Sequence, residues 1–261
     1  SYAYGRWLKY VGDSDNAPEY QRLTGKQIGS KYGFIANGLF QSEEEIANSA
    51  TVKGYKALPG YIKYVDRNGD GIITAAQDQG YVGKSATPKH TGSLNLFGNW
   101  KGFDFDLLFS WGLGNVVALT GQYTASGSVG TQDNTSFTKP FYHGGNSPTF
   151  LVENSWTPDN TNAEFPRLEI SGPSNNNGFS STFWYRNGNY MRLKTAQIGY
   201  NFPKKWLTPA GIEGLRLYVE GYNLLTFSGL TKYNIDPESP AVNNGYYPQQ
   251  RTYTLGVKLT F

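Results

Sequence analysis

The sequence predicts an all-β protein, and more specifically a part of a large antiparallel transmembrane β-barrel. Several segments of about ten residues alternate apolar with polar side chains, which suits strands with one face toward lipid and one toward a wet lumen. Gly (32), Tyr (20) and Phe (15) are abundant, whereas the chain has one Met and no Cys. Short and long connections follow one another alternately between these segments. These three observations together predict the fold class.

The composition excludes several other classes of protein. The mean hydropathy is −0.52 and no run of about 18 apolar residues occurs, so a helical membrane protein is excluded. The absence of Cys excludes disulfides and thiolate metal sites. A net charge of +3 without a Lys or Arg run gives nucleic-acid binding no support. His90 and His143 lack metal-site spacing and no G-x-S-x-G motif is present, so we expect no enzyme.

The first expected strands lie in the N-terminal part of the chain. A poorly patterned strand is expected over Tyr2–Val11, and the clearest pair over Ser93–Trp100 and Phe103–Trp111. Lys101-Gly102 joins this pair as a two-residue hairpin loop. The apolar face of the second strand of the pair consists of Phe103, Phe105, Leu107, Phe109 and Trp111. The opposite face carries two predicted lumen-facing acids, Asp104 and Asp106.

Three further strands are expected toward the C-terminus. The segment Tyr190–Phe202 has an ambiguous register, with Arg192 and Lys194 on one face. Leu215–Thr226 alternates clearly, and its charged residues Arg216 and Glu220 are predicted to face the lumen. Thr252–Phe261 places Tyr253, Leu255, Val257, Leu259 and Phe261 on one face. Taken alone, this last strand also fits the edge of a soluble β-sandwich.

The lengths of the connections give a topology for about six strands. The loops at 101–102 and 203–214 are short, whereas 12–87, 112–182 and 227–249 are long. Outer-membrane barrels have short periplasmic turns and long extracellular loops, so the long segments are expected outside and the C-terminus in the periplasm. The smallest such barrels have about eight strands. Residues 1–261 are therefore expected to be part of a larger barrel, closed either by more of the same chain or by other chains.

Asp66–Asp78 (DRNGDGIITAAQD) resembles a calcium-binding loop in its spacing. In the D-x-[DN]-x-[DN]-G pattern, oxygens at positions 1, 3, 5 and 7 surround the ion and Gly at position 6 makes the turn. The expected calcium ligands are Asp66, Asn68, Asp70, the Ile72 carbonyl and Asp78. The usual Glu of position 12 is replaced by Gln77. The alternative is an Asn-Gly turn held by Asx hydrogen bonds without a metal.

Aromatic residues in the long connections are candidates for contact with a ligand. Flat rings bury much area at small entropic cost, which suits sugar faces and peptide side chains. The candidates are Tyr142, Trp156, Trp184, Tyr246 and Tyr247. Packing within the loops or an aromatic girdle at the membrane interface is the alternative for each ring.

Several motifs resemble the C-terminal barrel segment of SusC/RagA-type TonB-dependent outer-membrane transporters of Bacteroidetes. These are Ile28–Ile46 (IGSKYGFIANGLFQSEEEI), YVDRNGDGIITAAQD, Trp156–Leu168 (WTPDNTNAEFPRL), Ser181–Pro203 (STFWYRNGNYMRLKTAQIGYNFP), LRLYVEGYNLLT and Asp236–Glu238 (DPE). The resemblance implies a roughly 22-stranded barrel, of which residues 1–261 form the C-terminal portion. It also implies an N-terminal plug and TonB box, which lie outside residues 1–261.

The expected function is TonB-dependent uptake of a large nutrient across the bacterial outer membrane, with an oligosaccharide as the cargo. The resemblance implies a SusD-like surface lipoprotein as a lid, TonB as the energy-coupling partner, outer-membrane lipid around the barrel, and a dimer of transporter–lipoprotein pairs. Two alternatives stay open. One is peptide uptake of the RagA type, and the other is a secreted calcium-stabilised, β-rich carbohydrate-binding module.

Overall fold

The computed structural model divides into two compact units, which we describe separately. We call Ser1–Ala3, Pro88–Asn115 and Asn187–Phe261 the sheet unit, and Tyr4–Thr87 with Val116–Arg186 the loop unit. The structure describes residues 1–82, 85–119, 149–168, 176–239 and 249–261. None of the helices within these residues is long and apolar enough to cross a membrane.

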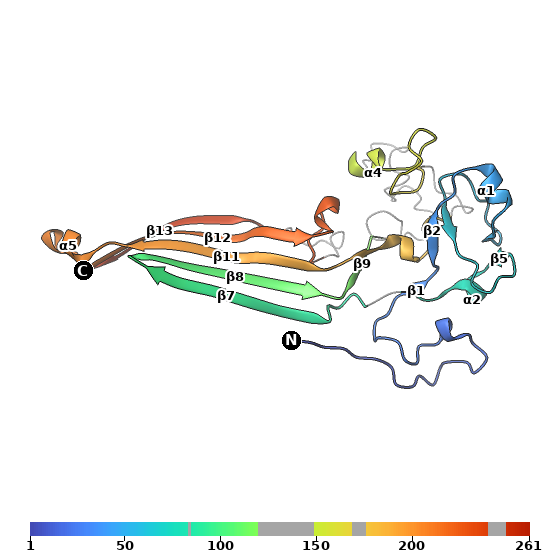
Figure 1. Ribbon diagram of the computed structural model, residues 1–261, viewed down its shortest axis with the longest axis horizontal. Coiled ribbons are helices and arrows are strands. Elements are labelled where there is room, and N and C mark those ends of the chain that lie inside the picture. Colours follow the sequence, from blue (N-terminus) through green and yellow to red (C-terminus); the bar gives the residue numbers. More distant parts are fainter. Residues whose placement is uncertain (83–84, 120–148, 169–175, 240–248) are drawn as a thin grey trace, which may run out of the picture. The chain divides into compact units, whose positions relative to one another are not determined.

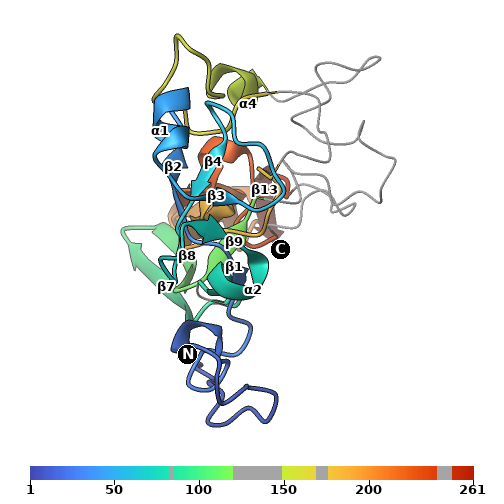
Figure 2. The ribbon, with the colours of Figure 1, turned by 90° about the vertical axis from the view of Figure 1, so that its right-hand side faces the viewer.

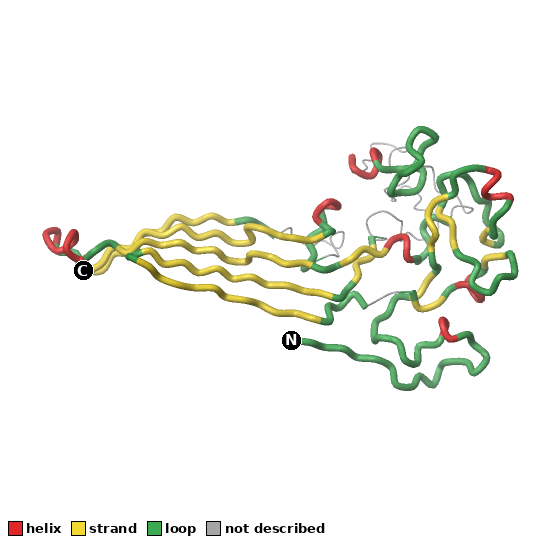
Figure 3. The backbone as a smooth tube through the Cα atoms, viewed as in Figure 1, coloured by secondary structure: helices red, strands yellow, loops and turns green. Residues whose placement is uncertain are grey.

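The sheet unit is one five-stranded antiparallel sheet (Figure 1). Its long strands are hydrogen-bonded in the order β13-β12-β11-β8-β7, and Figure 3 shows them side by side. The strands are β7 (His90–Trp100), β8 (Phe103–Leu113), β11 (Tyr190–Asn201), β12 (Gly214–Ser228) and β13 (Thr252–Thr260). These strands coincide with five of the six expected segments.

The two faces of the sheet have opposite polarity. Phe105, Ile198, Val219 and Leu255 pair in register and form one row across four strands. In isolation from other chains these side chains are 43%, 59%, 55% and 77% exposed. The neighbouring row on the other face is Asp106, Gln197, Glu220 and Thr254. Apolar side chains so exposed along every strand need an apolar environment outside the chain, as the lipid-facing side of a barrel provides.

A β-bulge explains why the register of β11 was ambiguous from the sequence. Between Leu193 and Thr195 the pairing of β11 shifts against both β8 and β12. Asn223 on β12, near this point, has the positive φ of 54°. A bulge inserts an extra residue and breaks the two-residue period, so the alternation before and after Lys194 belongs to two different phases.

The predicted hairpin turn and the short connection are both present at one end of the sheet. Lys101 and Gly102 have φ values of 49° and 93°, as a two-residue turn with a right-handed strand twist requires. The β11–β12 connection contains α5 (Lys204–Leu207) and η5 (Thr208–Ala210). Aromatic rings continue from the sheet into this connection: Tyr200 contacts Phe103 and Phe202, with centroids 4.7 and 5.0 Å apart.

The prediction of a strand over Tyr2–Val11 is wrong. Tyr2 makes a single bridge to His90, and the Ala3 amide donates to the Lys89 carbonyl at 2.8 Å. From Tyr4 onward the chain belongs to the loop unit, where Arg6 makes an isolated bridge to Gln27. The segment lacks a sustained alternation of apolar and polar residues. It therefore adds no further strand beside β7 in the described sheet.

The loop unit consists of short elements joined by turns, and β2 pairs with β4 within it (Figure 2). The β1–β6 and β9–β10 pairs form two further two-stranded sheets, and β3–β5 pair in parallel. Its helices are η1 (Glu19–Gln21), α1 (Glu43–Ala47), α2 (Ala75–Asp78), α4 (Thr149–Glu153) and η4 (Thr182–Trp184). Its strands are β1 (Tyr32–Gly33), β2 (Ala36–Leu39), β3 (Thr51–Val52), β4 (Ile62–Tyr64), β5 (Ile72–Ile73), β6 (Gly80–Tyr81), β9 (Val116–Ala118) and β10 (Tyr185–Asn187), whose last residue is assigned to the sheet unit.

The loop unit has a hydrophobic core of its own. The most deeply buried side chains are Phe34, Ile62, Ile73, Leu119, Leu151, Phe165 and Trp184, each at most 1% exposed. Burial of such side chains stabilises a fold by about 1.5–3 kcal/mol each. Residues of the long connections 12–87 and 112–182 thus build a packed unit.

Candidate functional site

The four predicted lumen-facing residues lie on the polar face of the sheet. Arg216 on β12 reaches Asp104 on β8 with two hydrogen bonds, one of them from Nε to Oδ2 at 2.9 Å. Its guanidinium also donates to the Gln197 Oε1 atom at 2.9 Å. Asp106 pairs in register with Gln197 and, through it, with Glu220. The polar face is therefore organised by charge pairing across three strands.

Gly199 on β11 makes the Arg216–Asp104 pair possible. A Cβ atom at residue 199 would lie 2.6 Å from Nη2 of Arg216. The guanidinium of Arg216 therefore passes directly over the backbone of the intervening strand. Glycine in a strand often marks such a close approach.

Near the opposite end of β11, Arg192 is the centre of a second charge cluster, which we call the Arg192 clamp. Only 2% of Arg192 is exposed. Its Nη1 donates to Glu238 at 2.7 Å and to Gln249, and its Nη2 donates to Asp236 at 2.8 Å. Its Nε donates to Thr226 Oγ1 on β12 at 3.0 Å. One buried guanidinium thus fixes both described ends of the connection between β12 and β13.

The Arg192 clamp is supported by neighbours that share its carboxylates. Lys194 lies 3.1 Å from the Oε1 atom of Glu238, and the Tyr190 hydroxyl donates to the same atom at 3.3 Å. The Glu238 amide donates to Asp236 Oδ1 at 2.9 Å, which holds the DPE turn in place. A buried charge is stable only when it is paired and hydrogen-bonded in this way.

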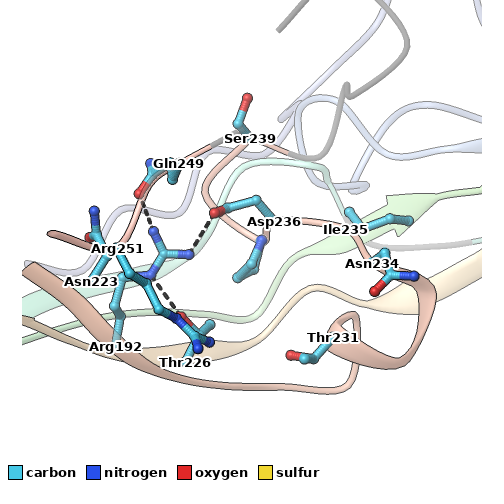
Figure 4. A pocket seen from close by; sticks show the side chains of 11 residues that line it. Arg192, Asn223, Thr226, Thr231, Asn234, Ile235, Asp236, Ser239, Gln249 and Arg251 are labelled. Atoms are coloured by element: carbon cyan, nitrogen blue, oxygen red, sulfur yellow. Dashed lines mark hydrogen bonds and ion pairs between the residues drawn. The ribbon is translucent and has the colours of Figure 1, made fainter. Parts of the chain in front are cut away.

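A cavity of about 360 Å³ lies beside the Arg192 clamp (Figure 4). Figure 4 shows Arg192 and Thr226 on one side of it and the turn that carries Asn234, Ile235 and Asp236 on another. The other lining residues are Asn223, Thr231, Pro237, Ser239, Gln249 and Arg251. The volume falls in the range of small-ligand pockets, and most of the lining side chains can donate or accept hydrogen bonds.

The calcium-type loop is shaped by hydrogen bonds from its own backbone. The two carboxylate oxygens of Asp66 accept from the amides of Gly69 and Gly71, each at 2.7 Å. Asp70 accepts from the Asn68 side chain and the Ile72 amide, and these bonds hold the pKa of Asp70 below its usual range. Asp70 therefore carries its negative charge at neutral pH.

Asp78 closes the calcium-type loop at its base. The carboxylate is fully buried and accepts from the amides of Arg67 and Thr74, each at 2.7 Å. Among the residues that the structure describes, no group of three or more His, Cys, Asp or Glu side chains converges as a metal site. The oxygen-rich set of the loop suits a hard cation chemically, yet its shape is already fixed by Asx-type hydrogen bonds.

Comparison with known proteins identifies the chain. No protein-family model matches it. It is 32% identical over 95% of its length to the TonB-dependent receptor P3 of Formosa agariphila, and 29% identical over 92% of its length to the receptor P26 of the same organism. The chain belongs to the TonB-dependent receptors. It spans about a quarter of the length of these relatives, covering 24% and 23% of them.

Solved structures show the same fold as this TonB-dependent receptor segment. A structure of the RagAB peptide transporter superimposes with a TM-score of 0.59 at 23% identity, over 94% of this chain and 24% of that one. The RagAB peptide importer in the open-open state gives a TM-score of 0.56 at 22% identity, over 88% of this chain and 22% of that one. The predicted fold class, a part of a large outer-membrane β-barrel, is confirmed.

Two of the aromatic ligand candidates are core residues of the loop unit in this receptor segment. Trp184 is fully buried, and its Nε1 donates to the Asn177 carbonyl at 2.8 Å. Trp156 is 7% exposed; it packs against Gly60 and donates to Gln41 Oε1 at 3.0 Å. Both rings are therefore buried in the core of the loop unit, not exposed for contact with a ligand as the sequence predicts. The remaining candidates Tyr142, Tyr246 and Tyr247 lie outside the described residues.

Sequence reasoning does not predict the Arg192 clamp, although it singles out Arg192 and the Asp236–Glu238 motif. Arg192 was assigned to a face of an ambiguous strand, and Asp236–Glu238 entered only as a family motif. Arg192 is separated from Asp236 by 44 positions, so no local spacing links them. The signal in the sequence is the chemistry of Arg192 itself, since an Arg that becomes buried requires carboxylate partners.

Proposed function

We propose that the full-length protein is an outer-membrane importer that uses TonB to drive uptake of a large nutrient, and that this chain forms part of its barrel wall. The observation that carries the proposal is the polarity of the sheet. Four neighbouring strands, β8, β11, β12 and β13, carry an exposed apolar row on one side and a polar row on the other. On the polar side an ion pair joins β8 to β12. Membership of the TonB-dependent receptors supplies the energy source in the proposal.

The proposed cargo is an oligosaccharide or a peptide. An oligosaccharide is the cargo expected from the family resemblance, whereas the fold likeness to the RagAB peptide importer favours a peptide. In the same proposal a SusD-like lipoprotein acts as the lid, TonB contacts a region outside residues 1–261, and two transporter–lipoprotein pairs form a dimer. The receptor itself performs no covalent chemistry.

Growth of a deletion strain tests the proposed function directly. Without the receptor gene, we expect loss of growth on one class of nutrient in a panel of oligosaccharides and peptides. Disruption of TonB should produce the same loss, because the energy for uptake arrives through TonB. Normal growth of the deletion strain on every nutrient that depends on TonB would contradict the proposal, and loss on peptides alone would settle the cargo in favour of the RagA type.

The proposed orientation places the loop unit outside the cell and Phe261 in the periplasm, and it can be tested together with calcium binding. We propose that Ca²⁺ occupies the Asp66–Asp78 loop with a Kd of about 10⁻⁴ to 10⁻³ M and stiffens it. A protease added to intact cells should then cut this loop, and should cut it faster with a calcium chelator than with millimolar Ca²⁺.

A matched variant separates the two parts of that prediction. In Asp70→Asn the loop keeps an oxygen at each position but loses one charge, so calcium protection should weaken while the fold is kept. Cleavage rates that do not change with calcium in the natural protein would count against a calcium site. Absence of cleavage in intact cells, with cleavage after permeabilisation, would reverse the orientation.

A further inference from the structure

We infer that the cavity beside the Arg192 clamp binds a carboxylate carried by the cargo, with Arg251 as the residue that pairs with it. The inference rests on the proposed function, because it assigns a subsite for the imported molecule. It concerns a single chemical group, an anionic carboxylate on a small polar unit. Such a group occurs at the C-terminus and acidic side chains of peptides and in the uronic acids of glycans.

The distribution of charge around the cavity favours an anion. Arg192 and Lys194 are matched by Asp236 and Glu238, with the three described ion pairs at 2.8, 2.7 and 3.1 Å. These four side chains therefore leave no net charge. Arg251 lines the same cavity, is exposed, and has no ion-pair partner among the residues that the structure describes. The described lining of the cavity thus carries one uncompensated positive charge.

The backbone at Arg251 is held in place by the contacts of its neighbours along the chain. Gln249, two positions earlier, accepts a hydrogen bond from the buried Arg192. The carbonyl of Gln250 accepts from the Asn223 side chain at 3.1 Å. Strand β13 begins directly afterwards at Thr252, which pairs with Tyr222. A guanidinium on a fixed backbone loses less entropy on binding than one on a free loop, and its fork matches a carboxylate.

The remaining lining of the cavity suits a polar organic unit rather than a bare inorganic anion. Thr231, Asn234 and Ser239 offer neutral hydrogen-bonding groups. Ile235 and Pro237 supply an apolar surface next to them. A volume of about 360 Å³ is large enough for one sugar ring or a short stretch of peptide. In such pockets a few neutral hydrogen-bonding groups and a charged side chain fix the orientation of the ligand.

The experiment compares paired probes on the purified full-length receptor. An acidic peptide is compared with its neutral amide, and an oligogalacturonide with a neutral galactan of equal length. The natural receptor should bind at least one acidic probe more tightly than its neutral partner. Arg251→Gln should lower the affinity for that acidic probe about tenfold, because one charge-assisted pair is lost. The affinity for the neutral partner should not change. Arg251→Lys should recover part of the loss.

Lys258→Gln is the matched control, since it removes the same charge from the polar side of β13 outside the cavity. Preference for the acidic peptide alone or for the oligogalacturonide alone supports the inference and identifies the source of the carboxylate. Equal weakening of acidic and neutral probes by Arg251→Gln would overturn it, as would equal binding of both probes to the natural receptor. Either negative result leaves TonB-dependent growth intact, so it is distinguishable from failure of the proposed function.

Discussion

Replacement of Arg192 by Met is expected to destabilise the folded receptor by about 3 kcal/mol, because two carboxylates lose the cation that compensates them. Arg192 is nearly fully buried, whereas the side chains of Asp236 and Glu238 are 21% and 15% exposed. Partial access to water limits the cost to the lower end of what a broken buried pair usually costs. Urea unfolding of the full-length protein, followed by heat-modifiable gel migration, measures the effect.

The effect of Arg192→Met should disappear when the acids are neutralised as well. The triple variant Arg192→Met, Asp236→Asn, Glu238→Gln contains no uncompensated charge at the clamp, so it should unfold at nearly the natural urea concentration. Arg192→Lys should recover little, because a single ammonium group cannot contact Thr226, Asp236, Glu238 and Gln249 together. An unchanged unfolding midpoint for Arg192→Met would show that the clamp contributes no stability.

The faces of the strands could be predicted from the sequence because the side-chain period of a strand is two. Apolar and polar side chains alternate along the whole of β13, as Tyr253, Thr254 and Leu255 illustrate. The pairing with β12 has no register shift, so the alternation is kept. The same rule failed in β11, where the bulge near Lys194 shifts the phase. A bulge is a property of the pairing between strands, so the sequence of a single strand carries little trace of it.

The core of the loop unit was not predictable by the same reasoning. Phe34 and Trp184 pack into one core although 150 positions separate them, and neither lies in an alternating segment. Trp156, which is also buried, begins the polar segment WTPDNTN, and this polar setting suggests contact with a ligand. Only tertiary packing distinguishes these roles, because an aromatic ring suits a core and a binding surface equally well.

Placing an Arg at Leu255 is expected to prevent stable insertion of the barrel, whereas an Arg at the adjacent Thr254 should be tolerated. Leu255 is 77% exposed on the apolar face, at the end of the row formed with Val219, Ile198 and Phe105. A charge on the lipid face costs about 2–4 kcal/mol at the bilayer midplane.

The Thr254→Arg variant is the matched control for Leu255→Arg. Thr254 pairs with Glu220 on the polar face, where an added guanidinium meets a carboxylate and water. The two variants differ by one position and carry the same charge, so a difference in folded yield in detergent micelles or bilayers reports which face meets lipid. A secreted, calcium-stabilised carbohydrate-binding module would give the opposite result, because a charge on an exposed apolar face would then improve solubility. Equal yields for both variants would contradict the membrane-facing assignment of this side of the sheet.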